Sequence, residues 1–144
     1  MKIFSLIIAS LIFFTGFSQE KKDSTEVMQS IAHPEHPAEF PGGNAQWIKY
    51  LERNMNREIA HKYLSIPKGE KFVKQTVQLL FEIGTEGQTM HIVVENLADI
   101  HPAIAKEAVR IITESPKWKP ASQDGKPVTD QRRQKLSFMW SNSF

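Results

Sequence analysis

The sequence predicts an α+β domain in which two helices pack on a three-stranded antiparallel sheet, in the order helix, strand, strand, helix, strand. Apolar residues recur at helical spacing in residues 44–55 and 102–112, whereas residues 72–83, 90–95 and 128–140 contain alternating apolar positions. A short connection containing glycine joins the first two alternating segments, which is typical of an antiparallel hairpin. Since helices and strands do not strictly alternate, we expect the helices to cover one face of the sheet.

The first 18 residues have the character of a secretory signal. Lys2 supplies a positive start, and the run from Ile3 to Phe14 is almost uniformly apolar and ends shortly before a charged stretch. This order matches a signal peptide, and the apolar run is shorter than the roughly 20 residues that a membrane-spanning helix needs. We therefore expect export, with a signal peptide over residues 1–18 cleaved near Ser18. An uncleaved membrane anchor is the alternative.

Residues 19–39 are polar, contain two prolines and lack the apolar surface needed to fold alone. We therefore expect a flexible leader there. His33 and His36 have a spacing that two metal ligands can have, but Pro37 follows them in a stretch expected to lack structure, so we predict no metal site. The folded domain is predicted over residues 40–144.

Composition limits the class of protein. The formal net charge is +2, and it falls to +1 when Lys2 is removed with the signal, so nothing favours a nucleic-acid partner. The chain has no cysteine, which excludes disulfides and a lipid-modified N-terminal cysteine. The roughly 126 residues that follow the signal are enough for one domain with a modest core.

The first helix and the hairpin follow from local patterns. A turn cluster at residues 40–43 precedes Asn44, a candidate N-cap. The apolar stripe of the helix consists of Trp47, Ile48, Leu51 and Met55. In the next segment the alternate residues from Val73 to Ile83 share one face, so we expect a strand with one buried side.

The second helix is expected to begin at Pro102, with Asp99 as a candidate cap, and to end before Pro116. A rigid extended segment follows, with Trp118 expected to pack on this helix. A turn at residues 124–127 then leads into a last strand over residues 128–140. This strand places Leu136, Phe138 and Trp140 on one face.

The sequence contains no arrangement that is typical of an enzyme. It has no cysteine nucleophile, no nucleophile elbow and no phosphate-binding loop. His91 lies on the outer face of a predicted strand and His101 precedes a helix proline, so we expect both to be surface or hydrogen-bonded residues. We predict a binding domain without cofactor or catalytic activity. An enzyme or small-ligand carrier using His91 or the region of Trp118 is the minor alternative.

The middle of the last strand, Asp130 to Lys135, is polar on both faces. Polar and charged residues keep an exposed sheet edge soluble, but the same edge offers unpaired N–H and C=O groups to a partner segment. Protection from aggregation and strand addition therefore both fit this segment. Edge-to-edge pairing of two copies of the chain is a further reading.

Residues 40–140 resemble the TonB C-terminal domain family in its Bacteroidetes form. The most specific match is Ser115-Pro116-Lys117-Trp118-Lys119-Pro120, followed by Asp124-Gly125-Lys126-Pro127-Val128. Further matches are Phe40-Pro41-Gly42-Gly43, the Tyr50-Leu51 pair, Phe81-Glu82-Ile83 before Gly87, and the helix from His101 to Ile112.

This resemblance implies the same α+β fold, a place in the periplasm and binding of outer-membrane transporters. In that family the third strand pairs with an extended transporter segment, the TonB box. Carried over to this chain, the partner-binding residues on the third-strand edge are Val128, Asp130, Arg132, Arg133, Gln134 and Lys135.

Two features separate this chain from a force-transmitting member of the family. Residues 56–60 read Asn-Arg-Glu-Ile-Ala where the family carries a Tyr-Pro pair. The leader of about 21 residues spans at most roughly 70 Å when fully extended. We therefore interpret the chain as a periplasmic TonB-like interaction domain that binds a transporter or another envelope protein. A membrane-anchored energy transducer that retains residues 3–17 is the alternative.

Overall fold

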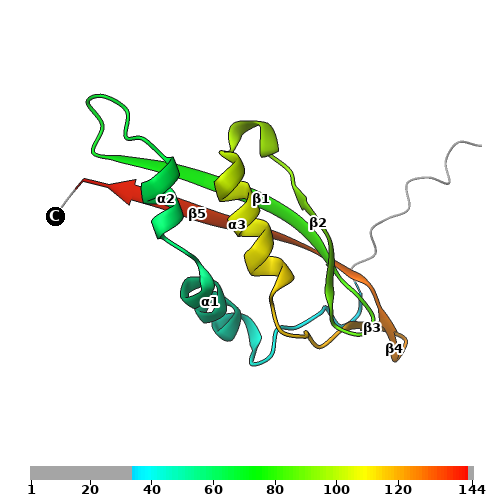
Figure 1. Ribbon diagram of the computed structural model, residues 1–144. Coiled ribbons are helices and arrows are strands. Elements are labelled where there is room, and N and C mark those ends of the chain that lie inside the picture. Colours follow the sequence, from blue (N-terminus) through cyan, green and yellow to red (C-terminus); the bar gives the residue numbers. More distant parts are fainter. Residues whose placement is uncertain (1–33, 143–144) are drawn as a thin grey trace, which may run out of the picture. The chain divides into compact units, whose positions relative to one another are not determined.

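The computed structural model describes residues 34–142. The predicted signal segment, its cleavage position and most of the predicted leader lie outside these residues. Within residues 34–142 the elements are α1 (Gly43–Asn54), α2 (Glu58–Tyr63), β1 (Phe72–Ile83), β2 (Thr89–Val94), the 3₁₀ helix η2 (Leu97–Asp99), α3 (Pro102–Thr113), β3 (Ala121–Gln123), β4 (Lys126–Val128) and β5 (Asp130–Ser141) (Figure 1).

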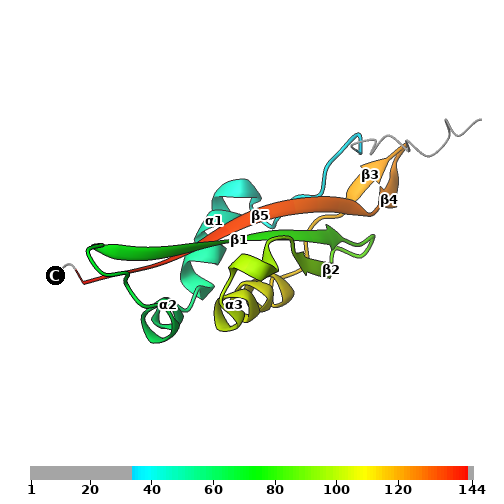
Figure 2. The same ribbon diagram turned by 90° about the horizontal axis from the view of Figure 1, so that it is seen from above.

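The predicted fold class is confirmed. β2, β1 and β5 form an antiparallel sheet in that order, with β1 at the centre. β1 and β5 pair without a register shift from Phe72 opposite Ser141 to Ile83 opposite Asp130. The pairing of β1 with β2 is interrupted by an irregularity after Leu80. Figure 2 shows α2 and α3 together on one side of β1 and β5.

The short helix α2, the 3₁₀ helix η2 and the strands β3 and β4 were not predicted from the sequence. The short helix α2 follows α1 after a brief turn, and β3 and β4 form a separate small hairpin before the last strand. The predicted strand over residues 128–140 is therefore divided, because Val128 pairs with Ala121 in the hairpin whereas β5 begins at Asp130. A strand cannot belong to both ladders without a change in direction at this point.

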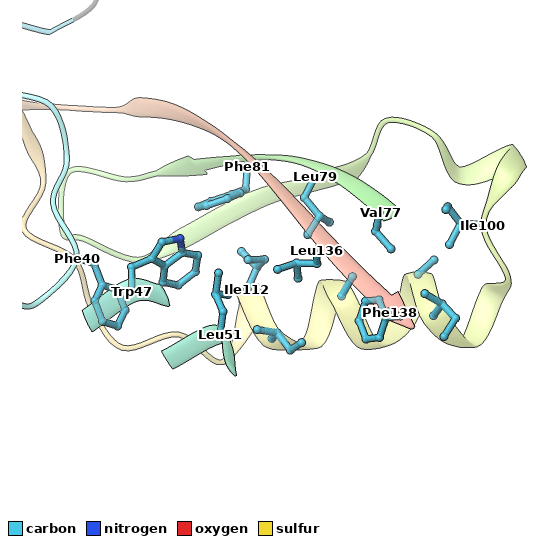
Figure 3. Packing of buried hydrophobic residues seen from close by; sticks show 14 of the residues in the cluster. Phe40, Trp47, Leu51, Val77, Leu79, Phe81, Ile100, Ile112, Leu136 and Phe138 are labelled. Atoms are coloured by element: carbon cyan, nitrogen blue, oxygen red, sulfur yellow. The ribbon is translucent and has the colours of Figure 1, made fainter. Parts of the chain in front are cut away.

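The core lies between the sheet and the helices. Alternate residues of β1, among them Val77, Leu79 and Phe81, are at most 1% exposed and lie on the side of the strand that faces the helices (Figure 3). Leu136 and Phe138 of β5 lie on the same face, as the alternating pattern predicts. Full burial of each such side chain contributes about 1.5–3 kcal/mol, so this face stabilises the sheet strongly against the helices.

An aromatic cluster closes one end of the core. The ring centroid of Trp118 lies 4.9 Å from that of Trp47 and 5.4 Å from that of Phe40. Trp47 also stacks on Tyr50 at 5.5 Å. Trp118 was predicted to pack on the second helix, but these contacts place it against α1 and the segment before it. The extended segment around Trp118 returns along the α1 side, and this path could not be read from local spacing.

Helix α3 begins at Pro102, as predicted, but its cap is His101. The imidazole Nδ1 of His101 accepts a hydrogen bond from the N–H of Ala103 at 3.2 Å, whereas the predicted cap Asp99 lies in η2. A side chain that satisfies a free N–H at a helix start stabilises the helix by about 1 kcal/mol. His101 therefore has a structural partner.

Residues 34–40, here called the arm, are part of the fold. The N–H and C=O of His36 exchange hydrogen bonds with Ser122 at 3.1 and 2.8 Å, and those of Glu39 do so with Lys119 at 2.9 and 2.8 Å. The arm thus runs beside the segment that contains β3. Two pairs of backbone hydrogen bonds fix it there.

The arm also contacts the first residues of β5. Ala38 is 2% exposed, and its N–H donates to a carboxylate oxygen of Asp130 at 2.9 Å. The predicted boundary at residue 40 is therefore corrected, since the folded domain includes at least residues 34–39 of the predicted leader. Local composition missed this because the partners of the arm lie some 80 to 90 residues away in the sequence.

Within residues 34–142, no helix combines the length and the apolar character that crossing a membrane requires. This finding does not bear on the predicted signal segment.

Candidate functional site

Strand β5 forms one edge of the three-stranded sheet. Its 12 residues pair with β1 on one side, and within residues 34–142 no strand pairs with its other side. An unpaired strand edge presents a row of N–H and C=O groups that another segment can complete. This edge is the candidate functional site.

The groups that face outward can be assigned from the ladder. Glu95 donates its N–H to the carbonyl of Gln78 at 2.8 Å, so the peptide groups of Gln78 point toward β2. Gln78 lies opposite Lys135 of β5. Opposite residues of an antiparallel pair direct their N–H and C=O groups either toward each other or both away. Those of Lys135 therefore point off the free edge.

The same alternation applies along the rest of the strand. The outward peptide groups belong to Arg133, Lys135, Ser137 and Met139, whereas the intervening residues bond to β1. We call the backbone of residues 133–139 on this side the β5 edge. It offers four outward N–H and C=O pairs along about 20 Å of regular strand.

The six residues predicted for partner binding fall into three groups. Val128 lies in β4 and is not part of the β5 edge. Asp130, Arg132 and Gln134 direct their side chains to the helix-covered face. Arg133 and Lys135 have exposed side chains and outward peptide groups. The sequence thus located the strand but did not distinguish its two faces.

Two of the inward polar residues, Asp130 and Arg132, hold neighbouring parts of the fold. Besides its bond to Ala38, Asp130 lies 3.3 Å from the guanidinium Nε of Arg132. Arg132 donates to the carbonyl of Ala38 and lies over the ring of Trp118. The polar groups of both residues therefore hold the arm in place through hydrogen bonds to Ala38. A role in contacting a partner is not needed to explain why these two residues are charged.

On the outer face, Arg133 pairs with Glu95, the residue that follows β2, with 3.2 Å between the guanidinium Nε and a carboxylate oxygen. The Arg133 side chain is 69% exposed, and an ion pair so open to water contributes little stability. The hydroxyl groups of Thr76 and Ser137 also share one hydrogen bond of 2.9 Å on the same face. The outer face of β5 is therefore polar and solvated.

A groove runs between the β5 edge and α1. It consists of two neighbouring cavities of about 450 and 510 Å³. Gln134 contributes to the lining of both. The first lies between the arm, Trp47 and residues 132–134 of β5. The second is bounded by α1 on one side and by residues 134–139 of β5 on the other.

The second cavity has an apolar lining. Leu51 of α1 and Met55, the residue that follows this helix, face Leu136 and Phe138 of β5 across it. Ile48, predicted to be part of the buried stripe of the first helix, is instead 48% exposed at the rim of the groove. An extended segment bound to the β5 edge would direct alternate side chains into this apolar space.

The position of α1 is fixed by a partly buried ionic network. The carboxylate of Glu107 on α3 accepts the N–H of Asn56 at 3.0 Å and two hydrogen bonds from Arg110 at 2.7 and 2.8 Å. Arg110 also donates to the carbonyl of Asn54, the last residue of α1, at 2.7 Å. These contacts attach the end of α1 to α3 and so hold one wall of the groove.

Hydrogen bonding and burial set the acidity of this network. The hydrogen bonds from Arg110 lower the pKa of Glu107 below its ordinary value, although burial of the carboxylate opposes the shift. The same contact raises the pKa of Arg110. Burial of the Tyr50 phenol raises its pKa, and its hydroxyl donates to the carbonyl of Ile111 at 2.9 Å. Each shift has a structural cause in the contacts that α3 makes within itself and with α1.

The candidate residues of the minor alternative have other partners. His91 lies in β2 with its Nδ1 2.8 Å from a carboxylate oxygen of Glu82, on an exposed surface. Trp118 is 7% exposed within the aromatic cluster. Among residues 34–142, no three histidine, aspartate or glutamate side chains gather as a metal site.

The sequence did not predict the C-terminal half of the β5 edge or the contribution of α1 to the groove. Ser137 and Met139 were not among the predicted binding residues, although they continue the outward alternation that begins at Arg133. The signal available was Met139 itself, an apolar residue on the polar face of the strand that is 61% exposed. The contribution of α1 required the tertiary arrangement.

Comparison with known proteins finds no family model, no curated protein and no solved structure that matches this chain. The relationship to TonB-like domains stays a prediction from the residues quoted above. The candidate site is defined by its geometry.

Proposed function

We propose that this protein is a periplasmic TonB-like interaction domain that binds an extended segment of an outer-membrane transporter, or of another envelope protein, by strand addition to the β5 edge. The observation that carries the proposal is the regular row of outward peptide groups at residues 133–139, which lies beside the groove and its apolar second cavity. Main-chain hydrogen bonds would supply affinity, and alternate side chains in the groove would supply selectivity.

The geometry supports binding in addition to protection of the edge. A protected edge is commonly short, bulged, charged toward its partner side or covered. The β5 edge is long and in regular register, and its charged side chains lie on the outer face or against the arm. Apart from Gln134, whose side-chain amide donates to the Lys135 carbonyl, the polar residues of β5 therefore leave the outward backbone of residues 135–139 accessible.

A single proline tests strand addition. Arg133→Pro removes one outward N–H without removing a hydrogen bond to β1, and Arg133→Ala removes the same side chain but keeps the N–H. With each variant immobilised, we expect wild type and Arg133→Ala to capture the same partner from solubilised cell envelopes, and Arg133→Pro to lose at least three quarters of it. Equal capture by a folded Arg133→Pro variant would exclude pairing at this residue.

The periplasmic part of the proposal rests on residues 1–18. Mass spectrometry of the protein purified from its cells should give a mature chain that begins near Gln19. A chain that retains residues 1–18 in the membrane fraction would instead support the anchored transducer.

A further inference from the structure

Gln134 has an unusual place on the β5 edge. Its peptide groups bond to β1, but its side-chain Nε2 lies 2.9 Å from the carbonyl oxygen of the next residue, Lys135. That carbonyl is one of the outward groups of the β5 edge. The side chain of Gln134 therefore occupies an acceptor that an added strand would use.

The orientation of the Gln134 amide follows from its two partners. Its Oε1 accepts the indole N–H of Trp47 at 2.9 Å. An indole nitrogen can only donate and a carbonyl oxygen can only accept, so the amide oxygen must face Trp47 and the amide nitrogen must face Lys135. Trp47 is 5% exposed and lies against Phe40 and Trp118, so one end of the amide is held by a rigid group.

The same side chain stands where the two cavities of the groove meet, since both are lined by Gln134. It connects α1 to β5 across the groove through Trp47 and Lys135. An extended segment lying along the whole β5 edge must pass this point. To bond Lys135 it must put its own N–H where the Gln134 amide now lies.

We propose that Gln134 is a gate of the β5 edge: its amide caps the Lys135 carbonyl in the free protein and is displaced by a backbone N–H when a strand is added. This inference rests on the proposed function. The gate keeps a regular, accessible edge from pairing indiscriminately. It also selects segments that supply an N–H at this position, so a proline there would be rejected.

Three variants test the gate. Gln134→Met has a similar length but cannot donate to the Lys135 carbonyl, and Gln134→Glu keeps an acceptor for Trp47 while losing the donor. Gln131→Met is the matched control, because Gln131 is an exposed residue of the same strand outside the groove. Thermal unfolding of each variant checks that the fold is retained.

The probe is a fluorescein-labelled seven-residue peptide of alternating threonine and valine, which matches the length of the β5 edge. Binding is measured by fluorescence anisotropy. We expect Gln134→Met and Gln134→Glu to bind it about fivefold more tightly than wild type, since a neutral hydrogen bond that must be given up corresponds to a factor of about 2 to 10. Gln131→Met should bind as wild type does.

A second readout follows the amide directly. On addition of the probe to wild type, the side-chain NH₂ resonance of Gln134 should shift as its hydrogen bond to Lys135 is lost. If the probe binds wild type but neither Gln134 variant binds more tightly, or if the resonance does not move, the gate is wrong and strand addition stands. If the probe binds none of the four proteins, strand addition itself is overturned, together with the gate.

Discussion

The two edges of the sheet differ in length, in regularity and in what lies beside them. β5 is a 12-residue strand without a register shift, and a groove with one apolar cavity separates its free edge from α1. β2 has six residues, its ladder contains an irregularity, and α3 lies next to it, with the Thr89 hydroxyl donating to the carbonyl of Ile112 at 3.0 Å. Short, irregular and covered strands are poor templates for pairing.

The comparison indicates that the two edges of this sheet have different roles. The β2 edge is held by the connection around Gly87 and by α3, so it mainly completes the core. The β5 edge is accessible over residues 133–139, and the gate at Gln134 restricts it. Four predictions, ordered from the largest expected effect to the smallest, test this difference.

The largest effect is expected when the buried face of β5 is changed. Phe138→Ala removes a ring that is 1% exposed and should lower the free energy of unfolding by about 3–5 kcal/mol. Met139→Ala, one residue further and 61% exposed, should change it by less than about 0.5 kcal/mol. Urea denaturation followed by tryptophan fluorescence measures both. Similar losses in the two variants would contradict the assigned faces of the strand.

The next effect concerns the connection that holds the β2 side. Gly87 has a φ of +83°, and a Cβ added there would lie 2.0 Å from the carbonyl oxygen of Trp118. Gly87→Ala should therefore lower the free energy of unfolding by about 2–4 kcal/mol. Gly125→Ala is the matched control, because its φ is also positive, at +72°, but nothing lies within 4 Å of the added Cβ.

Thermal unfolding of the two glycine variants separates strain from steric clash. Gly125→Ala should show only the cost of the left-handed backbone, about 1 kcal/mol. If both variants lose the same stability, close packing of Gly87 on Trp118 does not hold the β2 side in place.

A smaller loss of stability is expected when the contacts that attach α1 to α3 are weakened. The lowered pKa of Glu107 means that its ionised form stabilises the folded state above the ordinary value of 4.5, and this contribution is lost as the pH falls through the lowered pKa. Glu107→Gln should reduce the free energy of unfolding by about 2 kcal/mol at pH 7, because Arg110 and Asn56 lose a charged acceptor.

The difference between wild type and Glu107→Gln should shrink as the pH falls below the ordinary value of 4.5 and through the lowered pKa, because Glu107 of wild type becomes protonated. Denaturation at pH 7, 5, 4 and 3 measures it. A difference that stays constant over this range would mean that the charge of Glu107 does not stabilise the attachment of α1.

The smallest effect on stability, and the clearest on binding, is expected at exposed apolar residues of the two edges. Met139→Glu, at the rim of the groove, should weaken binding of the threonine-valine probe about fivefold. Val93→Glu, on β2 and 53% exposed, should leave binding unchanged. Both should unfold within about 0.5 kcal/mol of wild type. Equal weakening by the two substitutions would remove the distinction between the edges.

Much of the fold was predictable because it depends on local periodicity. The alternation from Val73 to Ile83 and the apolar face of α3 predict which sides are buried, and the structure confirms both except at Glu107, a charged residue of α3 that is only 5% exposed. The arm could not be predicted in this way, since Ala38 is ordered by Asp130 and Arg132 far along the chain. The division of the last strand after Val128 likewise depends on a pairing with Ala121.

The sequence by itself determined the fold class, the identity of the strand that forms the candidate edge, and the periodic burial of its apolar half. Only the tertiary structure decided which backbone groups of that strand are accessible, because this depends on how β1 pairs with both of its neighbours. It also decided that Asp130 and Arg132 hold the arm and that Gln134 caps the edge. Period-two patterns fix the face of a side chain, but its hydrogen-bond partners are set by segments that are distant in the sequence.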